Sequence, residues 1–374
     1  MISFALEEEE SLLQDTVRRI ACDLIRPKLR EIENGVPPGL GKTVAELGLP
    51  WLCASEADGG LGARLVTQLI ALEELAWGDA GSSLALCPSE NYVALLSSLG
   101  TQSERQRFLR PITDGADGAV GAVAYAAEKP DAVVVTTTTN NAYRLSGEKP
   151  FVLHAEMARF FLVFTETEVF VVEAGVGVSV IPGSPLLGLD AARPGKVMFD
   201  NAPAIRLEDP ALAERLPSAL VAATLRQSAR QVGLGRAAYE FALEYTQERK
   251  AFGKPVAHFQ AIAFELADLA IAVDSARWLL WRAADALLRP DAIAPGAQAI
   301  VQANEVAFHC ADRAVQLLGG AGFIRDFPVE KWLRETKALA LCGVPSDWCN
   351  EVIASAELGT PIEAPSLWMQ PFYS

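Results

Sequence analysis

Apolar residues in the first third of the chain, from about residue 7 to residue 112, recur every three or four positions. The first run of this kind is Leu13, Val17, Ile20 and Leu24. Polar and charged residues fill much of the opposite face, so the pattern predicts amphipathic helices. The stretch GLPWLCASEADGGLGA at 48–63 is rich in glycine and acidic residues, and it predicts an exposed loop before the next helical run.

The pattern changes between about residues 115 and 210. Short runs of β-branched and aromatic residues are separated there by Gly, Pro and Asn, as is typical of strands and turns. The runs are AVVVTTTT at 132–139, followed by Asn140 and Asn141, and then FFLVF, VFVVE, VSVI and KVMF. We expect a small antiparallel β domain.

Helical signals return after Pro217 and extend further. The predicted helices lie within 218–250, 256–289, 297–318 and 328–341. At 1.5 Å per residue, the first two would each be about 45 to 50 Å long, the length scale of an antiparallel helical bundle. The sequence therefore predicts an α+β fold with a helical domain at 1–112, an antiparallel β domain at 113–212 and a helical bundle at 213–374.

Composition excludes several classes of partner. The 374 residues are 51% hydrophobic and carry 47 acidic against 32 basic side chains, which gives a net charge of −15. Such a charge repels phosphate backbones and anionic membranes, so nucleic acid is not expected as a partner. No basic segment precedes an apolar run at the N-terminus, and no run of eighteen apolar residues occurs. We therefore expect no membrane insertion and a cytoplasmic protein.

Cysteine and histidine spacing gives no indication of a metal site. The six cysteines, which contain no C-x-x-C pair, are Cys22, Cys53, Cys87, Cys310, Cys342 and Cys349. The three histidines lie far apart, without the spacing that places two ligands on one helical face. We expect reduced, mostly buried thiols and no bound metal.

Three glycine-containing motifs have an ordinary structural interpretation. GLGRAA at 233–238 matches a dinucleotide fingerprint but lies in the middle of a predicted helix, where small residues let helices approach closely. ERKAFGKPVAHFQ at 248–260 ends one helix and begins the next. AVQLLGGAGF at 314–323 ends a helix with two glycines, whose amides could cap the helix or meet a phosphate.

Taken together and in this order, the last two motifs resemble those of the acyl-CoA dehydrogenase family. The resemblance extends over ELGLPWLCASEADGGLG, LSGEKPFVLH, YTQERKAFGKPVAHFQ and QLLGGAGFIRDFPVEKWLRETK. It implies an N-terminal helical domain, a middle β domain and a C-terminal four-helix bundle, usually in a tetramer with FAD at each active site. By this resemblance, the ADP half of a neighbouring subunit's FAD would contact Arg249, Phe252, Gln260, Gln316, Gly319 and Gly320.

The same comparison finds no catalytic base. Family members remove an α proton from an acyl thioester with a glutamate that follows the R-D-A-K segment, and the flavin accepts hydride from the β carbon. Here RETK at 334–337 aligns without a gap, and Gly343 stands at the glutamate position. Some members carry the base on an earlier helix, where this chain has Ala223. The resemblance therefore predicts no catalytic residue at either position.

Two further departures concern the flavin ring. AYAAEKPDAV at 124–133 replaces the family's T-E-P-x-A-G-S-D loop, and Phe151-Val152-Leu153 replaces its W-I-T motif. Leu153 lacks the hydroxyl that would bond the flavin N5 edge. The motifs for a site within this subunit are thus altered, whereas the motifs for a partner's FAD remain.

Three functions are compatible with this distribution. The favoured hypothesis is a non-catalytic subunit of an α2β2 acyl-CoA dehydrogenase, similar to bacterial enzymes of which some act on bulky CoA thioesters such as steroid side chains, with electron-transfer flavoprotein as the family's usual acceptor. The first alternative is a homotetrameric dehydrogenase with a displaced base, for which Asp347 is the nearest acidic residue. The second is a flavin-free scaffold or an acyl-CoA-binding protein.

Overall fold

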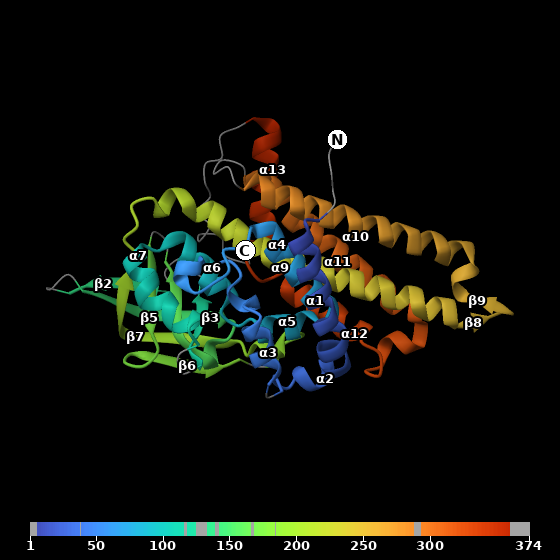
Figure 1. Cartoon of the computed structure of the whole chain (residues 1–374), viewed down its shortest axis with the longest axis horizontal. Coiled ribbons are helices and arrows are strands. Elements are labelled where there is room, and N and C mark those ends of the chain that lie inside the picture. Colours follow the sequence, from blue (N-terminus) through green and yellow to red (C-terminus); the bar gives the residue numbers. More distant parts are fainter. Residues whose placement is uncertain are drawn as a thin grey trace.

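The computed structural model describes residues 6–37, 39–115, 118–124, 133–138, 142–165, 168–183, 185–287 and 293–359. Figure 1 shows a sheet at one end of an elongated molecule and long helices that extend to a small hairpin, β8–β9, at the other end. Shorter helices pack between these two parts. The predicted fold class, α+β with helices, then a sheet, then helices, is confirmed. We keep 1–112, 113–212 and 213–374 as a working division.

The first helices follow the apolar periodicity of the sequence. α1 begins after Glu7 with a capping box, in which the Glu10 carboxylate accepts a hydrogen bond from the Glu7 backbone N–H and the Glu7 carboxylate accepts one from the Glu10 backbone N–H. Acidic residues in the first turn also favour the helix N-terminus. Of the predicted apolar residues, Leu13, Val17 and Ile20 lie in α1, and Leu24 lies in the π-helical turn that follows it. The helices are α1 Glu8–Ile20, α2 Leu29–Ile32, α3 Leu40–Glu46, α4 Leu65–Gly78, α5 Ala80–Leu86, α6 Glu90–Leu99, α7 Gln102–Glu104 and α8 Arg110–Thr113.

The segment 48–63 differs from the exposed loop that we predicted. It contains two 3₁₀ turns, Leu49–Trp51 and Glu56–Asp58. Leu49, Leu52 and Ala54 are buried, and the buried Asp58 accepts a hydrogen bond from Arg105 Nε at 3.0 Å. The acidic residue is therefore paired across the domain, which local sequence composition could not indicate.

The middle domain is a seven-stranded sheet with the order β1-β4-β5-β7-β3-β2, and β6 also pairs with β7. Its strands are β1 Val120–Ala124, β2 Val133–Thr137, β3 Tyr143–Val152, β4 Ala158–Phe164, β5 Val169–Glu173, β6 Val178–Pro182 and β7 Gly195–Arg206. The prediction of an antiparallel domain is wrong for one pair, because β1 and β4 run parallel. The turn at Asn140 and Asn141 lies outside the described residues.

The C-terminal bundle is built on three long helices, α9 Leu212–Glu248, α10 Gln260–Ala286 and α11 Ile293–Leu318. α9 begins earlier than predicted and contains Pro217 near its start, and it is about 55 Å long at 1.5 Å per residue. Two shorter helices, α12 Val329–Leu339 and α13 Ser346–Leu358, pack against α11. None of the described helices is long and apolar enough to cross a membrane.

The glycines of GLGRAA serve helix packing, as the sequence indicated. The motif lies within α9. A β-carbon at Gly233 would overlap the Glu73 carbonyl of α4, and one at Gly235 would lie 3.1 Å from the Ala307 α-carbon of α11. The helices therefore approach closely because these positions carry no side chain.

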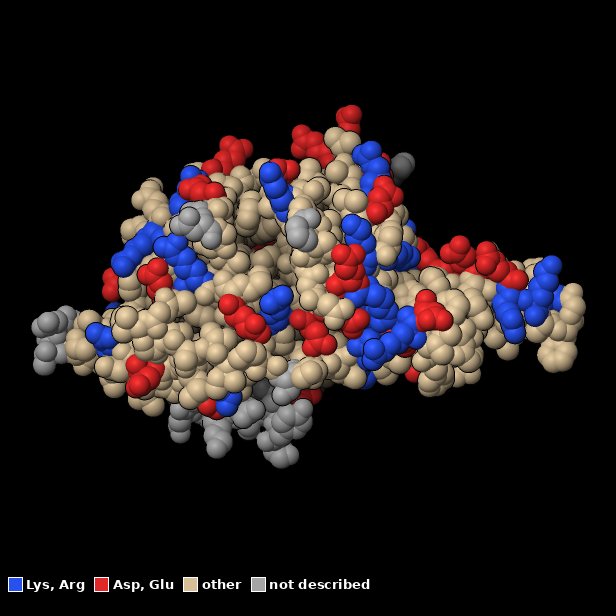
Figure 2. Space-filling model, turned by 90° about the horizontal axis from the view of Figure 1, so that it is seen from below, with Lys and Arg blue, Asp and Glu red and all other residues tan. Residues whose placement is uncertain are grey.

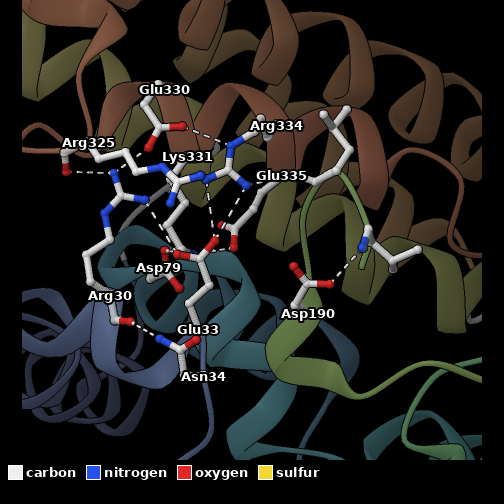
Figure 3. A network of polar contacts seen from close by, with 12 residues as sticks. Arg30, Glu33, Asn34, Asp79, Asp190, Arg325, Glu330, Lys331, Arg334 and Glu335 are labelled. Atoms are coloured by element: carbon white, nitrogen blue, oxygen red, sulfur yellow. Dashed lines mark hydrogen bonds and ion pairs between the residues drawn. The ribbon is translucent and has the colours of Figure 1, made fainter. Parts of the chain in front are cut away.

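A network of charged residues ties the three parts together (Figure 3). Arg334 on α12 donates to the Leu187 carbonyl of the middle domain at 2.7 Å and to Glu33, after α2, at 3.4 Å. Beneath it, the buried Lys331 binds Asp79 at 2.6 Å and also Glu335. Burial and the nearby Asp79 carboxylate raise the pKa of Glu335 to about 7.

Candidate functional site

The position at which the family glutamate would stand is a tight turn between α12 and α13. Gly343 has a φ of +106°, a backbone conformation that residues with side chains rarely adopt. The next amide, Val344 N–H, donates to Thr224 Oγ1 of α9 at 3.0 Å. The turn is therefore fixed against α9 by a buried hydrogen bond.

No side chain fits at Gly343 in this conformation. A β-carbon there would lie 2.6 Å from Thr224 Oγ1 and 2.9 Å from Thr224 Cγ2. Thr224 directly follows Ala223, the second position at which the family can carry a base, and both residues are buried. Gly343 thus packs against the residue next to the second candidate position, and neither position supplies a carboxylate.

Gly343 lines a small cavity of about 60 Å3. Phe151 and Leu153, at the end of β3, line it as well, so the structure brings together the positions that the sequence marked in two different domains. Most of the segment 124–133, the third departure, lies outside the described residues. The remaining wall comes from the end of α5, α6, β1 and α9.

Glu90, one of the residues that line the cavity, belongs to a buried charged pair that the sequence analysis did not find. Arg230 of α9 is fully buried, and its guanidinium donates to the Glu90 carboxylate of α6 and to Ser83 Oγ at 3.0 Å. Its third nitrogen donates to Gln227 Oε1 at 3.3 Å. Arg230 lies in the stretch LRQSARQV at 225–232, where nothing in the sequence distinguishes it from the neighbouring Arg226.

Burial makes the other titratable groups of the cavity neutral. It raises the pKa of the Cys87 and Cys342 thiols to about 12. Burial, aided by the Arg230 charge, lowers the pKa of His154 to about 3. His154 has a left-handed backbone, with φ at +61°, at the turn that follows β3. The thiols keep their protons at neutral pH, and an imidazole with a pKa of about 3 accepts a proton poorly, so none of these groups replaces the missing glutamate.

Asp347, the predicted alternative base, does not line the cavity. It lies in the first turn of α13, and its side chain is exposed, as is that of Glu351 one turn later. A base that takes a proton from a bound thioester has to be within hydrogen-bonding distance of it in a dry pocket. This geometry does not favour Asp347.

The predicted ADP-binding residues lie at the far end of the same long helix. Arg249 caps the C-terminus of α9, about 33 Å along the helix from Gln227 in the cavity. Its guanidinium makes no hydrogen bond or ion pair within the described part of the chain, and it is exposed. Gln260 opens α10 and is exposed as well.

The hairpin between these residues holds an unusual aromatic side chain. Phe252 has a φ of +50°, and 96% of its surface is exposed. Its ring makes an edge-to-face contact with Phe259, with the centroids 6.3 Å apart. A non-glycine residue in this conformation and an apolar ring in water are both unfavourable, so the arrangement indicates a surface that something else covers.

The second predicted group is at the end of α11. Gln316 is exposed, and the 3₁₀ turn Gly319–Phe323 follows the helix. No described atom lies within 4 Å of the space beside Gly319 or Gly320, and Phe323 is 82% exposed. Figure 2 shows basic side chains near the tip of the projecting part of the molecule, with a row of acidic side chains beside them.

Comparison with known proteins gives one consistent family. The model for the acyl-CoA dehydrogenase N-terminal domain matches residues 7–116, and that for the C-terminal domain matches residues 218–356. The benzylmalonyl-CoA dehydrogenase of Aromatoleum aromaticum is 29% identical over 375 residues, covering 94% of this chain and 99% of that protein. A short-chain specific acyl-CoA dehydrogenase of Clostridium acetobutylicum is 28% identical over 369 residues, covering 90% of this chain and 94% of that protein.

Solved structures show the same fold. Butyryl-CoA dehydrogenase from Megasphaera elsdenii superposes with a TM-score of 0.87 at 24% identity, covering 96% of this chain and 100% of that chain. A glutaryl-CoA dehydrogenase complex with glutaryl-CoA superposes with a TM-score of 0.86 at 25% identity, covering 96% of this chain and 97% of that chain.

Proposed function

Because the chain belongs to the acyl-CoA dehydrogenase family, we propose that it is a non-catalytic subunit that completes the FAD site of a catalytic homologue. In this family, bound FAD supplies the hydride acceptor and a protein carboxylate removes the α proton. The proposal assigns the proton transfer to the partner and cofactor binding to both chains.

The observation that carries the proposal is the turn at Gly343. Its positive φ and its contact with Thr224 leave no space for a side chain, and Ala223 is equally unable to take a proton. Loss of a positioned general base typically lowers the rate by two to four powers of ten. A family member built in this way is a poor catalyst on its own.

The projecting end of the bundle has the chemistry that the ADP half of FAD requires. Arg249 offers an unpaired guanidinium, which suits a diphosphate because it is planar and always charged. The open backbone at Gly319 and Gly320 lets another molecule approach closely. Phe252 and Phe323 offer exposed rings to an adjacent surface. These residues fit a cofactor that is bound mainly by a neighbouring subunit.

Within this chain, the position expected beside the flavin ring lacks a polar side chain to bond it. Leu153 lines the cavity with an apolar side chain and offers no hydroxyl to a flavin nitrogen. The cavity volume of about 60 Å3 also excludes a bulky acyl group. We therefore place a bulky CoA thioester in the partner's half of the assembly, with an electron-transfer flavoprotein as the acceptor.

One observation favours a second candidate, a homomeric dehydrogenase with a displaced base. Glu90 is a carboxylate that lines the cavity together with Gly343. Its hydrogen bond with Arg230 opposes this role, since one oxygen of the carboxylate is already occupied as an acceptor of that bond. Activity of the isolated chain that disappears in Glu90→Gln would support this candidate.

The decisive experiment counts flavin per chain. The protein is expressed alone and together with a catalytic homologue from the same genome, and flavin absorbance and oligomer mass are measured on the same samples. We expect one FAD per two chains, present only in a mixed tetramer. One FAD per chain in a homotetramer, bleached by an acyl-CoA, would contradict the proposal, and absence of flavin in both samples would favour a scaffold.

A further inference from the structure

A cleft of about 640 Å3 lies where the N-terminal helices meet the middle domain. We call it the α3 cleft, after the helix that forms one of its walls. Its volume is within the range of small-molecule sites, which often lie at domain boundaries. Among the described residues, it shares only Pro88 with the cavity that Gly343 lines, so it is separate from the site described above. Its apolar lining includes Val36, Ala45, Trp51, Ile112, Val120 and Met157.

The apolar lining of the α3 cleft is partly open to water. Met157 is 40% exposed, and Val36, Ala45 and Trp51 are half-buried. Removing apolar surface from water is favourable in proportion to its area. A ligand with an apolar chain is therefore expected to bind in this cleft more tightly than a polar molecule of the same size.

The charges at the α3 cleft are of one sign. Among the described residues that line it, the charged ones are Lys42 and Arg193, and both are cationic. Lys42 has the Glu46 carboxylate 3.7 Å away. Arg193 is exposed, and its guanidinium makes no hydrogen bond or ion pair within the described part of the chain. An apolar cleft with an unpaired cation is complementary to an apolar chain that ends in an anion.

The backbone of Arg193 is held in place. Its φ is +43°, in the left-handed region, and its N–H donates to the Asp190 carbonyl at 3.0 Å. The residues on either side, Ala192 and Pro194, are buried. A β-carbon built at Gly35 would lie 3.5 Å from Arg193 Nη2, so the guanidinium reaches from the middle domain to the N-terminal domain. Strained residues of this kind are often found where proteins bind ligands.

Arg193 also lines a more polar cleft, whose buried edge contains paired acidic groups. Glu33 accepts a hydrogen bond from Arg334 Nη2 at 3.4 Å, and Asp190 Oδ1 accepts one from the Leu186 N–H at 2.8 Å (Figure 3). Neither carboxylate is paired with Arg193. Its guanidinium is therefore available to an anion in the α3 cleft.

The remaining charges near Arg193 limit the charge of that anion. Arg325 and Glu156 line the polar cleft, their side chains have no partner within the described residues, and they carry opposite charges. These two charges cancel, so the single charge of Arg193 remains. A carboxylate balances it better than a phosphate dianion does. We propose that the α3 cleft binds a free fatty acid, with its alkyl chain against Trp51 and Met157 and its carboxylate on Arg193.

This inference does not rest on the proposed partner role. The α3 cleft contains neither the position of the missing base nor any residue assigned to FAD. Flavin stoichiometry tests the partner role, whereas binding of a fatty acid tests the cleft. Either can therefore fail without the other.

The test uses 11-bromoundecanoate, below its micelle-forming concentration, with the full chain or with the mixed oligomer. Bromine quenches the fluorescence of an indole ring that it contacts, and Trp51 lines the cleft. We expect saturable quenching, which decanoate reverses about tenfold more effectively than 1-decanol or decyltrimethylammonium, because only the carboxylate forms a charged hydrogen bond with Arg193. Trp51→Phe should remove most of the quenching. Trp278→Phe is its control, since Trp278 lies on α10 outside the cleft.

Arg193→Gln should lower the affinity for decanoate about tenfold and leave that for 1-decanol unchanged, which also shows that the cleft is intact in the variant. Arg19→Gln is the matched control, because Arg19 is an exposed arginine of α1 outside the cleft and should keep the preference for decanoate. Quenching that persists in Trp51→Phe would place the acid elsewhere and overturn the inference. Equal displacement by the three decyl compounds, or no saturable quenching, would overturn it as well.

Discussion

The middle of α9 and its C-terminus use arginine in opposite ways. At the middle of the helix, Arg230 is fully buried and every nitrogen of its guanidinium has a partner. At its C-terminus, Arg249 is exposed and its guanidinium has none within the described chain. The same residue type is therefore fully paired inside this chain at the middle of the helix and is available to another molecule at its C-terminus.

The difference shows where the chain is complete and where it is not. Around Gly343 each position is constrained by a neighbour, as Thr224 constrains the turn. Around Phe252 an exposed ring and a positive φ persist without any described contact that would compensate for both. A buried, fully paired middle and an exposed, unpaired C-terminus of α9 are compatible with the proposed subunit, which lacks its own base and contributes to a partner's FAD site.

Removing the buried arginine at the middle of α9 should have the largest effect on folding. We expect Arg230→Leu to lower the free energy of unfolding by about 3 to 5 kcal/mol, because the buried Glu90 carboxylate loses its nearest partner and keeps only Arg226, at 3.9 Å. Denaturant titration of the purified chain measures this change. The double variant Arg230→Leu, Glu90→Leu should recover most of the loss, because it removes both charges. A loss equal to that of the single variant would show that the pair is not the source.

Restoring the family glutamate should also destabilise the protein. Gly343→Glu places a side chain at a φ of +106° and against Thr224, and we expect a loss of roughly 2 to 4 kcal/mol from backbone strain and steric overlap. Gly343→Ala is the control, since it carries the β-carbon without the carboxylate and should cause most of the same loss. Acyl-CoA-dependent flavin bleaching by the Glu variant alone would instead mean that the site needs only its base.

The comparison also marks how far the sequence could be interpreted. Helices with an amphipathic stripe, such as α1, could be predicted because each contact that defines them is local. The parallel pairing of β1 with β4 could not, because β1 is a short strand whose partner lies more than thirty residues away. The turn at Gly343 could be located from an ungapped alignment, but its steric closure depends on Thr224, 119 residues earlier.

The buried pair of Glu90 and Arg230 beside the cavity could not be predicted from the sequence for the same reason. Glu90 and Arg230 lie 140 residues apart, and in the sequence each looks like an ordinary helical surface residue. Asp347 looked more suitable as a base because it is close to Gly343 in the sequence, although its side chain is exposed on α13. Proximity along the chain was thus a poor guide to the polar groups of the cavity.

The stability of the protein should depend on pH through Glu335, a buried carboxyl group on α12. Its pKa is raised to about 7, so the folded state retains a proton that the unfolded state releases near the usual value of 4.5. The resulting stabilisation is complete below about pH 4.5 and is lost as the pH rises to about 7. We expect Glu335→Gln to remove this dependence, on the order of 1 to 3 kcal/mol between pH 5 and pH 8. Denaturant titrations at the two pH values measure it, and an equal change in both proteins would contradict the assignment.

The smallest effect on folding, and the most informative on function, is expected at the exposed end. Arg249→Ala removes a side chain that makes no described contact, so the denaturation midpoint of the chain should not change. In the mixed tetramer, the same variant should lower flavin occupancy several-fold, because the cofactor diphosphate would lose a charged hydrogen bond. Lys250→Ala is the matched control, as it removes the adjacent exposed cation and should retain the flavin. If the two variants retain flavin equally, Arg249 does not bind the cofactor. The contrast between the exposed C-terminus of α9 and its buried middle then no longer supports a shared FAD site.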